Sequence, residues 1–581
     1  MTLDFRNINT LWSSIIVETL AKLGLKNAII SPGSRSTPLT LAFAQNNFIN
    51  SIPILDERSA SFFALGLAKK NKIPTVLICT SGTAGANFYP AIIEAKYSNI
   101  PLIILTADRP PELRNSHSGQ TINQVNLYGN YPNWHTELSL PSNDLERLFY
   151  LRQNIIYSWE KSCFPSRGIV HINIPFREPL APVSELEISE EKKTFIYQQL
   201  FTNFTPVNHS LKKNHLDLKK YLKLWQSHSK GIIIAGIDSP DNPQLYSEAI
   251  AFLSQSLNFP VLGEALSPVR NFSIINEHLI INYDVILRNL ENANNLIPEI
   301  VILFGEYPTS KQLRNWLNDH KIPTYIITTS EDNLDALHTN SIHLRINPEN
   351  FSKYLTNFDK KATSNYLYQW LKIDEKITIN LNEMMNEKEE IFEAKVAWML
   401  SQYLPEKTPI FIANSMSVRY AEFFWQKNNR QIQTYFSRGT NGIEGTLSTA
   451  LGIAYQNKPT VLLTGDLALL HDTNGFLINQ YLEGSLTIIL INNNGGGIFE
   501  MLPIADCQPL FEKYFATPQL IDFTNLTKTY NVDYKLINNW QQLQNLLTNL
   551  PEKGINLWEI KTNRKNDTIW LKDYLSFFID S

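Results

Sequence analysis

Apolar and polar residues follow one another along the chain in a recurring unit. A short apolar run rich in β-branched residues leads into a loop of Gly, Ser, Thr or Asn, and then into a longer segment with helical spacing. This order is typical of the βα units that build a parallel sheet. In the first part of the chain the unit occurs at residues 27–43, 75–96 and 101–113. The pattern therefore predicts an α/β fold.

The same unit returns in the last third of the chain. It occurs at residues 409–424, 434–455, 459–476 and 486–503. Four strand-end loops would thus lie at one edge of one sheet. Because ligands of open α/β sheets bind beyond the carboxyl ends of the strands, we expect the functional site in these loops.

Between the two blocks the signal is weaker, although residues 231–242 and 299–313 again look like strands followed by loops. The stretch 184–214 is polar and has no clean period, so it is predicted to be a linker. We expect three doubly wound parallel-sheet domains, at residues 1–185, 186–360 and 361–581.

Length, charge and composition narrow the class of protein. The 581 residues are enough for about three or four domains. A hydrophobic share of 43% excludes disorder for most of the chain, and a net charge of −4 without long blocks of like charge gives little support for nucleic-acid binding.

The cysteines and the N-terminus bear on the compartment. Cys79, Cys163 and Cys507 are isolated, so neither a disulfide framework nor a thiolate zinc site is indicated. Residues 1–24 carry charges inside an apolar pattern, which suits an amphipathic helix and not a signal peptide. No apolar run approaches the roughly 20 residues of a membrane span. We expect a soluble, cytoplasmic protein.

Two strand-end sequences predict a metal site. Gly465 and Asp466 end one predicted strand, and Asn492–Gly497 follow the next. A carboxylate, an Asn oxygen and a loop carbonyl suit Mg²⁺, with Mn²⁺ as an alternative, and Mg²⁺ commonly takes its other ligands from phosphate. The glycines would let a diphosphate approach the backbone, and a following helix N-terminus would favour its charge. Taken singly, either sequence is more often ordinary turn chemistry.

Glu57 is a further candidate. It lies after a short apolar run and before an amphipathic helical segment, in the string ILDERSASFFALGLAKK. Viewed alone, a Glu at this place most often complements the helix macrodipole.

Five cations lie in loops that should face one cleft. One such residue is unremarkable, because most surface arginines are solvated or weakly paired. Several together indicate substrates with more than one carboxylate, since Arg recognises carboxylates through two parallel hydrogen bonds. These residues are Arg35, Arg109, Lys311, Arg419 and Arg438.

The strings SPGSRSTPL, TSGTAGANFYPA, TADRPPEL, GDLALLHDTN and NNNGGGIF together resemble the thiamine diphosphate enzymes, over essentially the whole chain. The resemblance implies domains of the thiamine diphosphate-binding type. It also implies that Asp466, Asn493 and the carbonyl of Gly495 hold Mg²⁺. Leu467 departs from the Gly that is usual at that position of the motif, which points toward a particular branch of the family.

The resemblance assigns further roles at the cofactor. Glu57 would hydrogen-bond N1′ of the aminopyrimidine and thereby promote loss of the thiazolium C2 proton. Ile443 would enforce the folded shape of the cofactor, although an ordinary core isoleucine is the alternative. The remaining cofactor contacts implied are Ser81, Gly82, Gly465, Leu467, Gly496, Ile498 and Phe499.

The branch that these motifs resemble acts in menaquinone and phylloquinone biosynthesis and joins 2-oxoglutarate to isochorismate. By this resemblance the succinyl side would be held by Ser415, Arg419 and Arg438. Isochorismate would be received by Arg35, Arg109, Gln120 and Lys311. The acceptor contacts depart from the family at Gly119 and Gln312. A homodimer or homotetramer is also implied.

Three alternatives remain open. Another thiamine diphosphate carboligase, such as an acetolactate synthase, would use pyruvate, against which the several arginines argue. A non-catalytic homologue could serve as an assembly partner, but Glu57, Asp466 and Asn493 are all present. A nicotinamide-dependent dehydrogenase lacks support, because no convincing G-x-G-x-x-G follows a predicted strand.

Overall fold

The computed structural model describes all residues except 1–2, 203, 205–217, 355–363 and 581. The chain divides into two compact units. The first unit comprises Met1–Lys212, Ser437–Gln456 and His471–Glu483, and the second comprises Lys213–Phe436, Asn457–Leu470 and Gly484–Ser581.

The first unit contains a six-stranded sheet of order β2-β1-β3-β4-β6-β5, in which every pairing is parallel. Its strands are β1 (Asn27–Ile30), β2 (Asn50–Pro53), β3 (Thr75–Cys79), β4 (Leu102–Asp108), β5 (Trp134–Glu137) and β6 (Ile169–Pro175). Its longer helices are α1 (Ile8–Leu23), α2 (Thr37–Ala44), α3 (Glu57–Asn71), α5 (Tyr89–Tyr97), α6 (Leu145–Cys163) and α7 (Glu190–Phe201). Strands β3, β4 and β6 are buried at every residue, because helices cover both faces.

Helix α16 (Thr446–Ala454) packs against α3 within the first unit. The two backbones approach very closely at two glycines. A Cβ atom on Gly66 would lie 2.1 Å from the carbonyl oxygen of Thr449, and one on Gly452 would lie 2.1 Å from that of Phe63. Only glycine fits at this crossing, which fixes the segment around α16 against the helix that begins at Glu57.

The second unit contains two further parallel sheets. The middle sheet has the order β12-β11-β10-β7-β8-β9. Its strands are β7 (Gly231–Ala235), β8 (Val261–Gly263), β9 (Leu279–Ile280), β10 (Ile300–Phe304), β11 (Thr324–Thr328) and β12 (Ser341–Arg345). The helices of this part are α8 (Leu218–Gln226), α9 (Pro243–Leu257), α10 (Tyr283–Ile286), α11 (Leu290–Asn295), α12 (Lys311–His320) and α13 (Asn365–Glu387).

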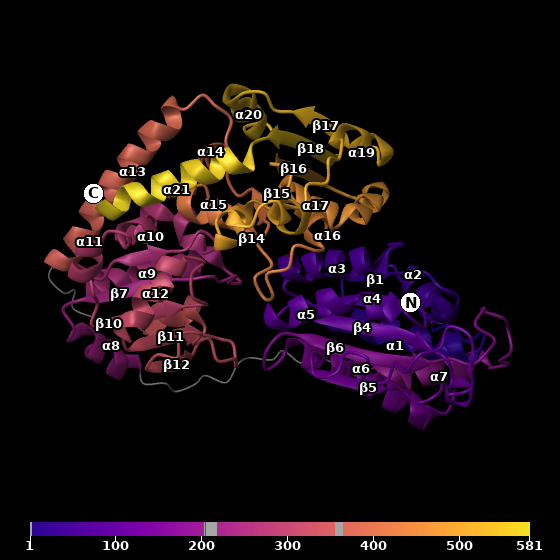
Figure 1. The fold of residues 1–581 in the computed structure, drawn as a ribbon. Helices are drawn as coiled ribbons and strands as arrows, with labels where there is room; N and C mark the ends of the chain where they lie inside the picture. The colour runs from indigo at the N-terminus through magenta and orange to yellow at the C-terminus, as the bar shows by residue number, and fades with distance from the viewer. Residues whose placement is uncertain (1–2, 203, 205–217, 355–363, 581) are drawn as a thin grey trace. The chain divides into compact units, whose positions relative to one another are not determined.

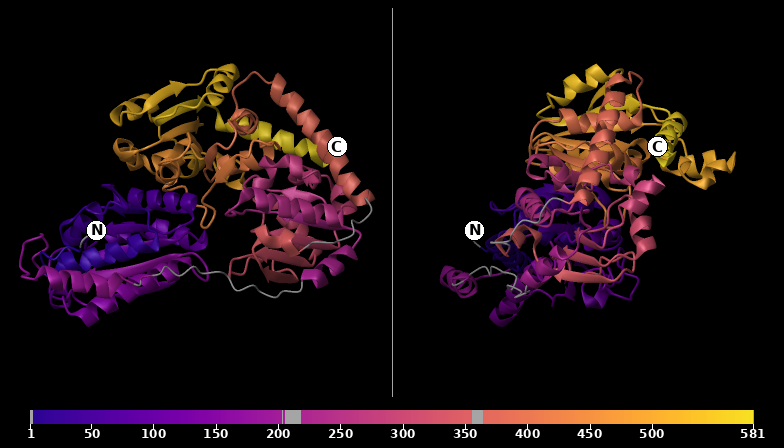
Figure 2. Two further views of the ribbon diagram at one scale, coloured as in Figure 1. Left: turned by 180° about the vertical axis from the view of Figure 1, so that it is seen from behind. Right: turned by 90° about the vertical axis from the view of Figure 1, so that its left-hand side faces the viewer.

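The third sheet has the order β14-β13-β15-β16-β18-β17, which repeats the connectivity of the first sheet. Its strands are β13 (Pro409–Ile412), β14 (Gln433–Tyr435), β15 (Thr460–Gly465), β16 (Ser485–Asn492), β17 (Asp533–Leu536) and β18 (Gly554–Lys561). The helices of this part are α14 (Glu393–Tyr403), α15 (Met416–Phe424), α17 (Asp466–Leu470), α18 (Gly497–Glu500), α19 (Phe523–Thr529), α20 (Trp540–Leu547) and α21 (Arg564–Asp580). Figures 1 and 2 show helices flanking the sheets.

The predicted α/β fold with three parallel sheets is confirmed. The linker prediction for 184–214 is wrong over part of its length, because residues 190–201 form α7. Ile196, Leu200 and Phe201 are buried in the core beneath the first sheet, so three apolar side chains at helical spacing suffice to dock a polar helix. The rest of that stretch lies partly outside the described residues.

The N-terminal helix also differs from the expectation. Every residue of α1 from Asn9 to Leu20 is buried, so the helix is covered on all sides and is not amphipathic. Two of its buried hydroxyl groups are satisfied on the helix itself: Ser14 Oγ donates to the carbonyl of Leu11 at 2.9 Å, and Thr19 Oγ1 donates to that of Ile15 at 2.7 Å.

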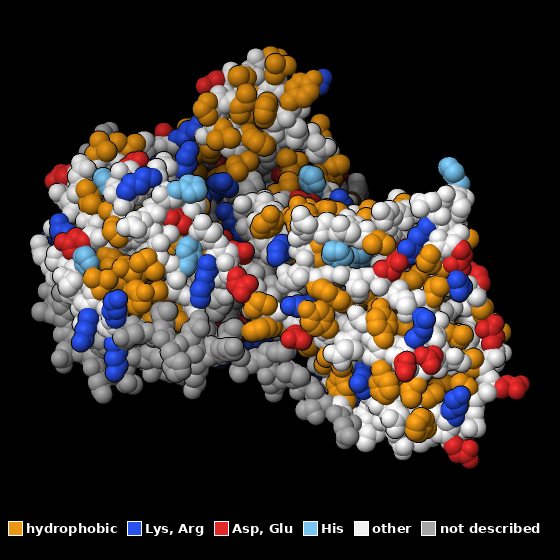
Figure 3. Space-filling view, turned by 90° about the horizontal axis from the view of Figure 1, so that it is seen from below, with side chains coloured by type: hydrophobic (Ala, Val, Ile, Leu, Met, Phe, Trp, Pro, Cys, Tyr) orange, Lys and Arg blue, Asp and Glu red, His pale blue; other side chains and the backbone are white. Residues whose placement is uncertain are grey.

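None of the described helices is long and apolar enough to cross a membrane. On the face drawn in Figure 3, Lys and Arg side chains are interspersed with Asp and Glu side chains.

Candidate active site

The two halves of the predicted metal site meet in the second unit. Strands β15 and β16 are parallel neighbours, with Gly465 opposite Ile491, so both strands end at the same edge of the sheet. Asp466 is the first residue after β15, and its Oδ2 accepts a hydrogen bond of 2.9 Å from the backbone N–H of Gly495. The carboxylate is 4% exposed, and burial raises the pKa of Asp466 to about 6. A cation at this carboxylate would offset the cost of burying its charge.

Asn493 presents an unused ligand atom at the same place. Its Nδ2 donates to Oε1 of Glu393 at 2.6 Å. Its Oδ1 is buried and has no hydrogen-bond partner among the described residues. Buried polar atoms are nearly always paired, so an unpaired amide oxygen beside a buried carboxylate fits a hard cation. Across the described residues there is no group of three or more His, Cys, Asp or Glu that could hold a metal.

The glycines after β16 allow a close backbone contact that the sequence did not predict. A Cβ on Gly495 would lie 2.4 Å from the carbonyl oxygen of Ala516, and one on Gly496 would lie 2.8 Å from that of Phe515. Gly495 also has a φ of 139°, which side chains disfavour. These glycines therefore let the loop pack on the chain's own backbone. The helix that follows, α18, has only four residues, so its dipole is weaker than the sequence suggested.

Arg564 holds the loop that follows β16 in place. Its Nη1 donates to the carbonyl of Asn494 at 3.0 Å, its Nε pairs with Glu500 at 2.9 Å, and its Nη2 pairs with Glu512. Ile498 and Phe499 lie between these anchors on α18 and are half-buried, as is Leu467 on α17. No local pattern marked Arg564, because its partners lie more than fifty residues away.

Glu57 is the first residue of α3 and follows β2, as the sequence predicted. Asp56 caps the helix by accepting from the N–H of Ser59 at 3.0 Å. The Glu57 carboxylate is half-buried and accepts from Nδ2 of Asn87 at 3.3 Å. One strong cap already serves the helix, so Glu57 is available for another partner.

The loop with Arg438 and Ile443 is held in the first unit by Glu94. The buried carboxylate of Glu94 accepts from the N–H groups of Gly439 at 3.1 Å and Thr440 at 2.8 Å. Arg438 and Ile443 are both half-buried in this loop. The sequence did not mark Glu94, which lies in the middle of α5 and looks like an ordinary helix charge.

Two predicted acceptor residues, Arg109 and Gln120, meet at the turn that carries the predicted cofactor contacts Ser81 and Gly82. Ser81 and Gly82 are buried after β3, and Gly82 has a φ of 86°. Arg109 donates to the hydroxyl of Ser81 and to the carbonyl of Gln120, and Nε2 of Gln120 donates to the carbonyl of Ser81 at 3.1 Å. This turn thus brings one guanidinium group and one side-chain amide together beside a strand end.

Arg35 lies near Arg109. Its side chain is 11% exposed, and it pairs with Glu178 at 3.3 Å and donates to the carbonyl of Phe176 at 3.0 Å. Burial lowers the pKa of Arg35, and the neighbouring charge of Arg109 acts in the same direction. The Nε atom of Arg35 is buried without a partner among the described residues. Two close guanidinium groups favour an anionic ligand.

Ser415 and Arg419 are joined in the second unit. Ser415 precedes α15 with φ 66° and ψ −129°, a conformation that a residue with a side chain rarely adopts. Nη1 of Arg419 donates to the carbonyl of Ser415 at 2.6 Å. Strained backbone of this kind concentrates at functional sites.

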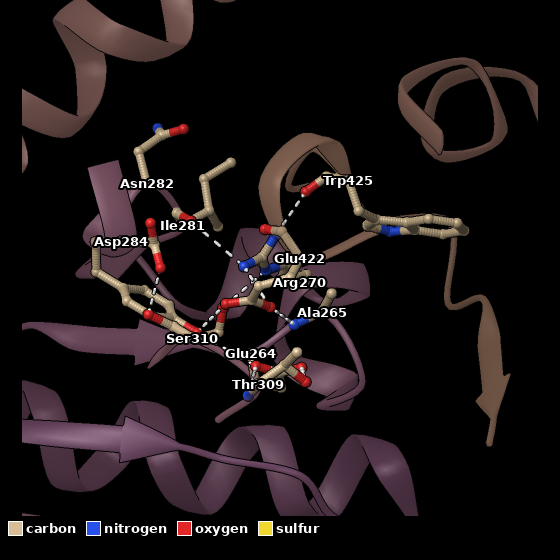
Figure 4. Close-up of polar contacts among 12 residues, drawn as sticks. Glu264, Ala265, Arg270, Ile281, Asn282, Asp284, Thr309, Ser310, Glu422 and Trp425 are labelled. Carbon is tan, nitrogen blue, oxygen red and sulfur yellow. Dashed lines mark hydrogen bonds and ion pairs between the residues drawn. The ribbon is translucent and has the colours of Figure 1, made fainter. Parts of the chain in front are cut away.

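Lys311 is exposed at the start of α12, and a buried polar network holds that start. The backbone N–H and the hydroxyl of Thr309 each donate to Glu264 at 3.0 Å, and the hydroxyl of Ser310 donates to Asp284 at 2.5 Å. The other end of the network is Glu422 on α15, three residues after Arg419. Figure 4 shows the carboxylates of Glu264 and Glu422 close to the Arg270 guanidinium.

The predicted site residues therefore form groups within each unit. The first unit contains Arg35, Glu57, Ser81, Gly82, Arg109, Gln120, Arg438 and Ile443. The second unit contains Lys311, Ser415, Arg419, Gly465, Asp466, Leu467, Asn493, Gly495, Gly496, Ile498 and Phe499. The residues that hold these groups, and that the sequence did not mark, are Glu94, Glu264, Glu393, Glu422 and Arg564.

Three family models match the chain. Residues 12–127 match the N-terminal TPP binding domain of thiamine pyrophosphate enzymes, residues 198–412 match the middle domain of thiamine pyrophosphate enzymes, and residues 414–555 match their C-terminal TPP binding domain.

Close relatives extend over the full length. The chain is 57% identical to the 2-succinyl-5-enolpyruvyl-6-hydroxy-3-cyclohexene-1-carboxylate synthase of Gloeothece citriformis, covering 100% of both chains. It is also 57% identical to the protein of that name from Trichodesmium erythraeum, again over 100% of both. Among solved structures, benzoylformate decarboxylase from Polynucleobacter necessarius shares the fold, with a TM-score of 0.68 at 14% identity over 95% of this chain and 98% of the other.

Proposed function

Because the chain belongs to the 2-succinyl-5-enolpyruvyl-6-hydroxy-3-cyclohexene-1-carboxylate synthase family of thiamine diphosphate enzymes, we propose that it decarboxylates 2-oxoglutarate and joins the succinyl unit to isochorismate. The products are CO₂ and the compound for which the relatives are named. The membership confirms the resemblance found in the sequence. The observation that carries the proposal is the identity of 57% over the whole length of named relatives.

Thiamine diphosphate, when bound, supplies a carbon nucleophile for the 2-keto carbon and takes up the electron pair left as CO₂ departs. We assign Mg²⁺, or Mn²⁺ in its place, to Asp466, Asn493 and the carbonyl oxygen of Gly495. The buried and unpartnered Oδ1 of Asn493 and the buried carboxylate of Asp466 support this donor set.

Glu57 is assigned the role of sharing a proton with N1′ of the aminopyrimidine. Its place at the start of α3, where it accepts one long hydrogen bond of 3.3 Å from the amide of Asn87, leaves the carboxylate available for this contact. Ile443 would enforce the folded shape of the cofactor, and the apolar side chains of Ile498, Phe499 and Leu502 would exclude water from the reacting carbons. The backbone of the turns at Ser81–Gly82, Gly465–Leu467 and Gly495–Gly496 would hold the cofactor in place.

The substrates carry several carboxylates, and the assigned cations offset their charge. Ser415, Arg419 and Arg438 are assigned to the succinyl side. Arg35, Arg109, Gln120 and Lys311 are assigned to isochorismate, which is supported by the gathering of Arg109 and Gln120 around Ser81.

Four broader assignments complete the proposal. We place the domain boundaries at residues 1–185, 186–360 and 361–581. The enzyme would act in the cytoplasm as a homodimer or homotetramer, in menaquinone or phylloquinone biosynthesis.

The test is a product analysis by mass spectrometry. The purified protein is incubated with thiamine diphosphate, Mg²⁺, isochorismate and either 2-oxoglutarate or pyruvate, and each component is omitted in turn. The expected result is a succinyl adduct of isochorismate that forms only with 2-oxoglutarate and the complete cofactor set. Ligation with pyruvate, or no turnover with either donor, would contradict the proposal.

A further inference from the structure

The orientation of the Asn493 amide is set by a residue one hundred positions earlier in the chain. Glu393 begins α14, and its Oε1 accepts from Nδ2 of Asn493 at 2.6 Å. A carboxylate oxygen repels an amide oxygen at this distance, so the nitrogen of the amide must face Glu393. The oxygen therefore faces the other way, where it is buried and unpartnered among the described residues.

We propose that Glu393 is a positioning residue that holds Asn493 with its Oδ1 directed at the metal. The inference rests on the proposed function, because it takes Asn493 as a ligand. The contact does not require Glu393 to be charged, since Oε1 accepts in either protonation state. Residues behind metal ligands commonly fix their orientation, and losing such a partner typically costs roughly 10- to 100-fold in metal affinity.

Glu393 is itself firmly held. It is 2% exposed, and its backbone N–H donates to Oδ1 of Asp567 at 3.0 Å. The hydroxyl of Thr562 lies 3.4 Å from the same Oε1 that meets Asn493. The backbone of Gly497 lies close to the amide, because a Cβ on this residue would lie 2.9 Å from Nδ2 of Asn493. A rigid acceptor and a confined amide leave one orientation.

The same contact explains why a glutamate is buried here. Glu393 is 2% exposed, and burying a carboxyl group costs free energy unless it is hydrogen-bonded, so an apolar residue would cost less if the position were only part of the core.

The test measures metal binding directly. Mn²⁺ is titrated into the protein in the presence of thiamine diphosphate, and free Mn²⁺ is read from its electron paramagnetic resonance signal. Glu393→Leu, which cannot accept a hydrogen bond, is expected to raise the Kd for Mn²⁺ by roughly 10- to 100-fold. Glu393→Gln keeps an acceptor oxygen and is expected to stay within about threefold of the wild type. Wild-type affinity in Glu393→Leu would overturn the proposal.

A second test exchanges the two side chains, so that the proposal can still be tested if Glu393→Leu does not fold. Asn493→Asp places two carboxylates face to face and should weaken Mn²⁺ binding. In Asn493→Asp combined with Glu393→Gln, the new amide can donate to the new carboxylate and free its other oxygen for the metal. The double variant is therefore expected to bind Mn²⁺ more tightly than Asn493→Asp alone. Equal or weaker binding by the double variant would overturn the positioning role.

Two controls separate this inference from the proposed metal site. Asp374→Asn alters a buried carboxylate of the same unit that accepts hydrogen bonds from residues 281, 282 and 427, and it should leave the Kd for Mn²⁺ unchanged. Asp466→Ala should abolish tight binding. If Asp466→Ala binds as the wild type does, the metal site itself is wrong. If it fails to bind while both Glu393 tests give wild-type behaviour, only the positioning role is wrong.

Discussion

The carboxylates of Glu264 and Glu422 both accept a hydrogen bond from the hydroxyl group of Tyr283. The distance from the hydroxyl oxygen to Oε2 of Glu264 is 3.3 Å. Both glutamates are buried, and Arg270 forms an ion pair with Glu422 at 3.2 Å and lies close to Glu264 (Figure 4). Two buried carboxylates facing one guanidinium favour keeping a proton, and accordingly burial and the nearby Glu264 raise the pKa of Glu422 well above its usual range.

This pair predicts a pH dependence of stability. The folded state keeps a proton on Glu422 at pH values where the unfolded chain has lost it. The stabilisation that the protonated Glu422 gives is therefore fully present below the pKa of this group in the unfolded chain. It is lost as pH rises toward the pKa of the group in the folded state. Glu422→Gln removes this pH-dependent contribution to stability. The Tm of the variant minus the Tm of the wild type should therefore become more positive as pH is raised from 5.5 to 8.5. A constant difference in Tm over that range would contradict the shared proton.

Arg270 should be far less replaceable than either glutamate. Its guanidinium donates to the carbonyls of Gly263, Ile281, Glu422 and Trp425, and it supplies the counter-charge. Arg270→Met leaves a buried carboxylate without its partner and should cost about 3–5 kcal/mol in the free energy of unfolding. Urea denaturation at pH 7 measures this cost, and Arg177→Met, at an exposed ion pair, is the control. A cost below about 1 kcal/mol, the size of an exposed pair, would show that the network is not needed.

The sequence predicted the parts of the fold that are encoded locally. Apolar runs such as residues 75–79 and 102–108 are strands because each is a continuous β-branched or aliphatic stretch followed by turn residues. Asp466 and Asn493 could be paired in advance because the strands before them are consecutive and parallel.

The residues that support the site could not be found in this way. Glu393 acts on Asn493 across one hundred positions, and Glu94 acts on Thr440 across 346. A single Glu on a helix carries no local pattern that separates such an anchor from a solvated charge. The missed helix α7 has a similar cause, because its three buried side chains are few among polar neighbours.

Glu57 should be needed for turnover and not for cofactor binding. Glu57→Gln keeps the size of the side chain but cannot take up the proton shared with the aminopyrimidine. We expect kcat to fall by about 100- to 10,000-fold, as is typical for loss of a general acid or base. Binding of thiamine diphosphate with Mg²⁺, followed by tryptophan fluorescence, should change by less than about threefold.

The matched control for that variant is Glu112→Gln, at an exposed carboxylate paired with Arg177. It should leave both kcat and cofactor binding unchanged. Wild-type turnover in Glu57→Gln would remove Glu57 from cofactor activation.

Arg419 should bind the donor substrate, 2-oxoglutarate, and Arg109 should bind the acceptor substrate, isochorismate. A hydrogen bond to a charged group contributes about 1.5–3 kcal/mol, so each loss should raise one KM by roughly 10- to 100-fold. Arg419→Ala is expected to raise the KM for 2-oxoglutarate and to leave that for isochorismate nearly unchanged. Arg109→Ala is expected to do the opposite. Steady-state kinetics with each substrate varied in turn measures both, and equal effects on the two KM values would refute the division.

His171 should destabilise the first sheet in acid. It lies in β6, is 1% exposed and has its Nε2 2.8 Å from the hydroxyl of Thr106. Burial lowers the pKa of His171 to about 3, so the folded state keeps the ring neutral where the unfolded chain takes up a proton. Stability should therefore fall as pH drops below about 6.5, by about 1.4 kcal/mol at pH 5.5 for this group. His171→Gln removes this titrating group. Between pH 7.5 and 5.5 the free energy of unfolding of the variant, measured by urea denaturation, should therefore fall by about 1.4 kcal/mol less than that of the wild type. The exposed His117→Gln should behave as wild type, and an equal pH response in His171→Gln would mean that the folded state protonates this ring readily.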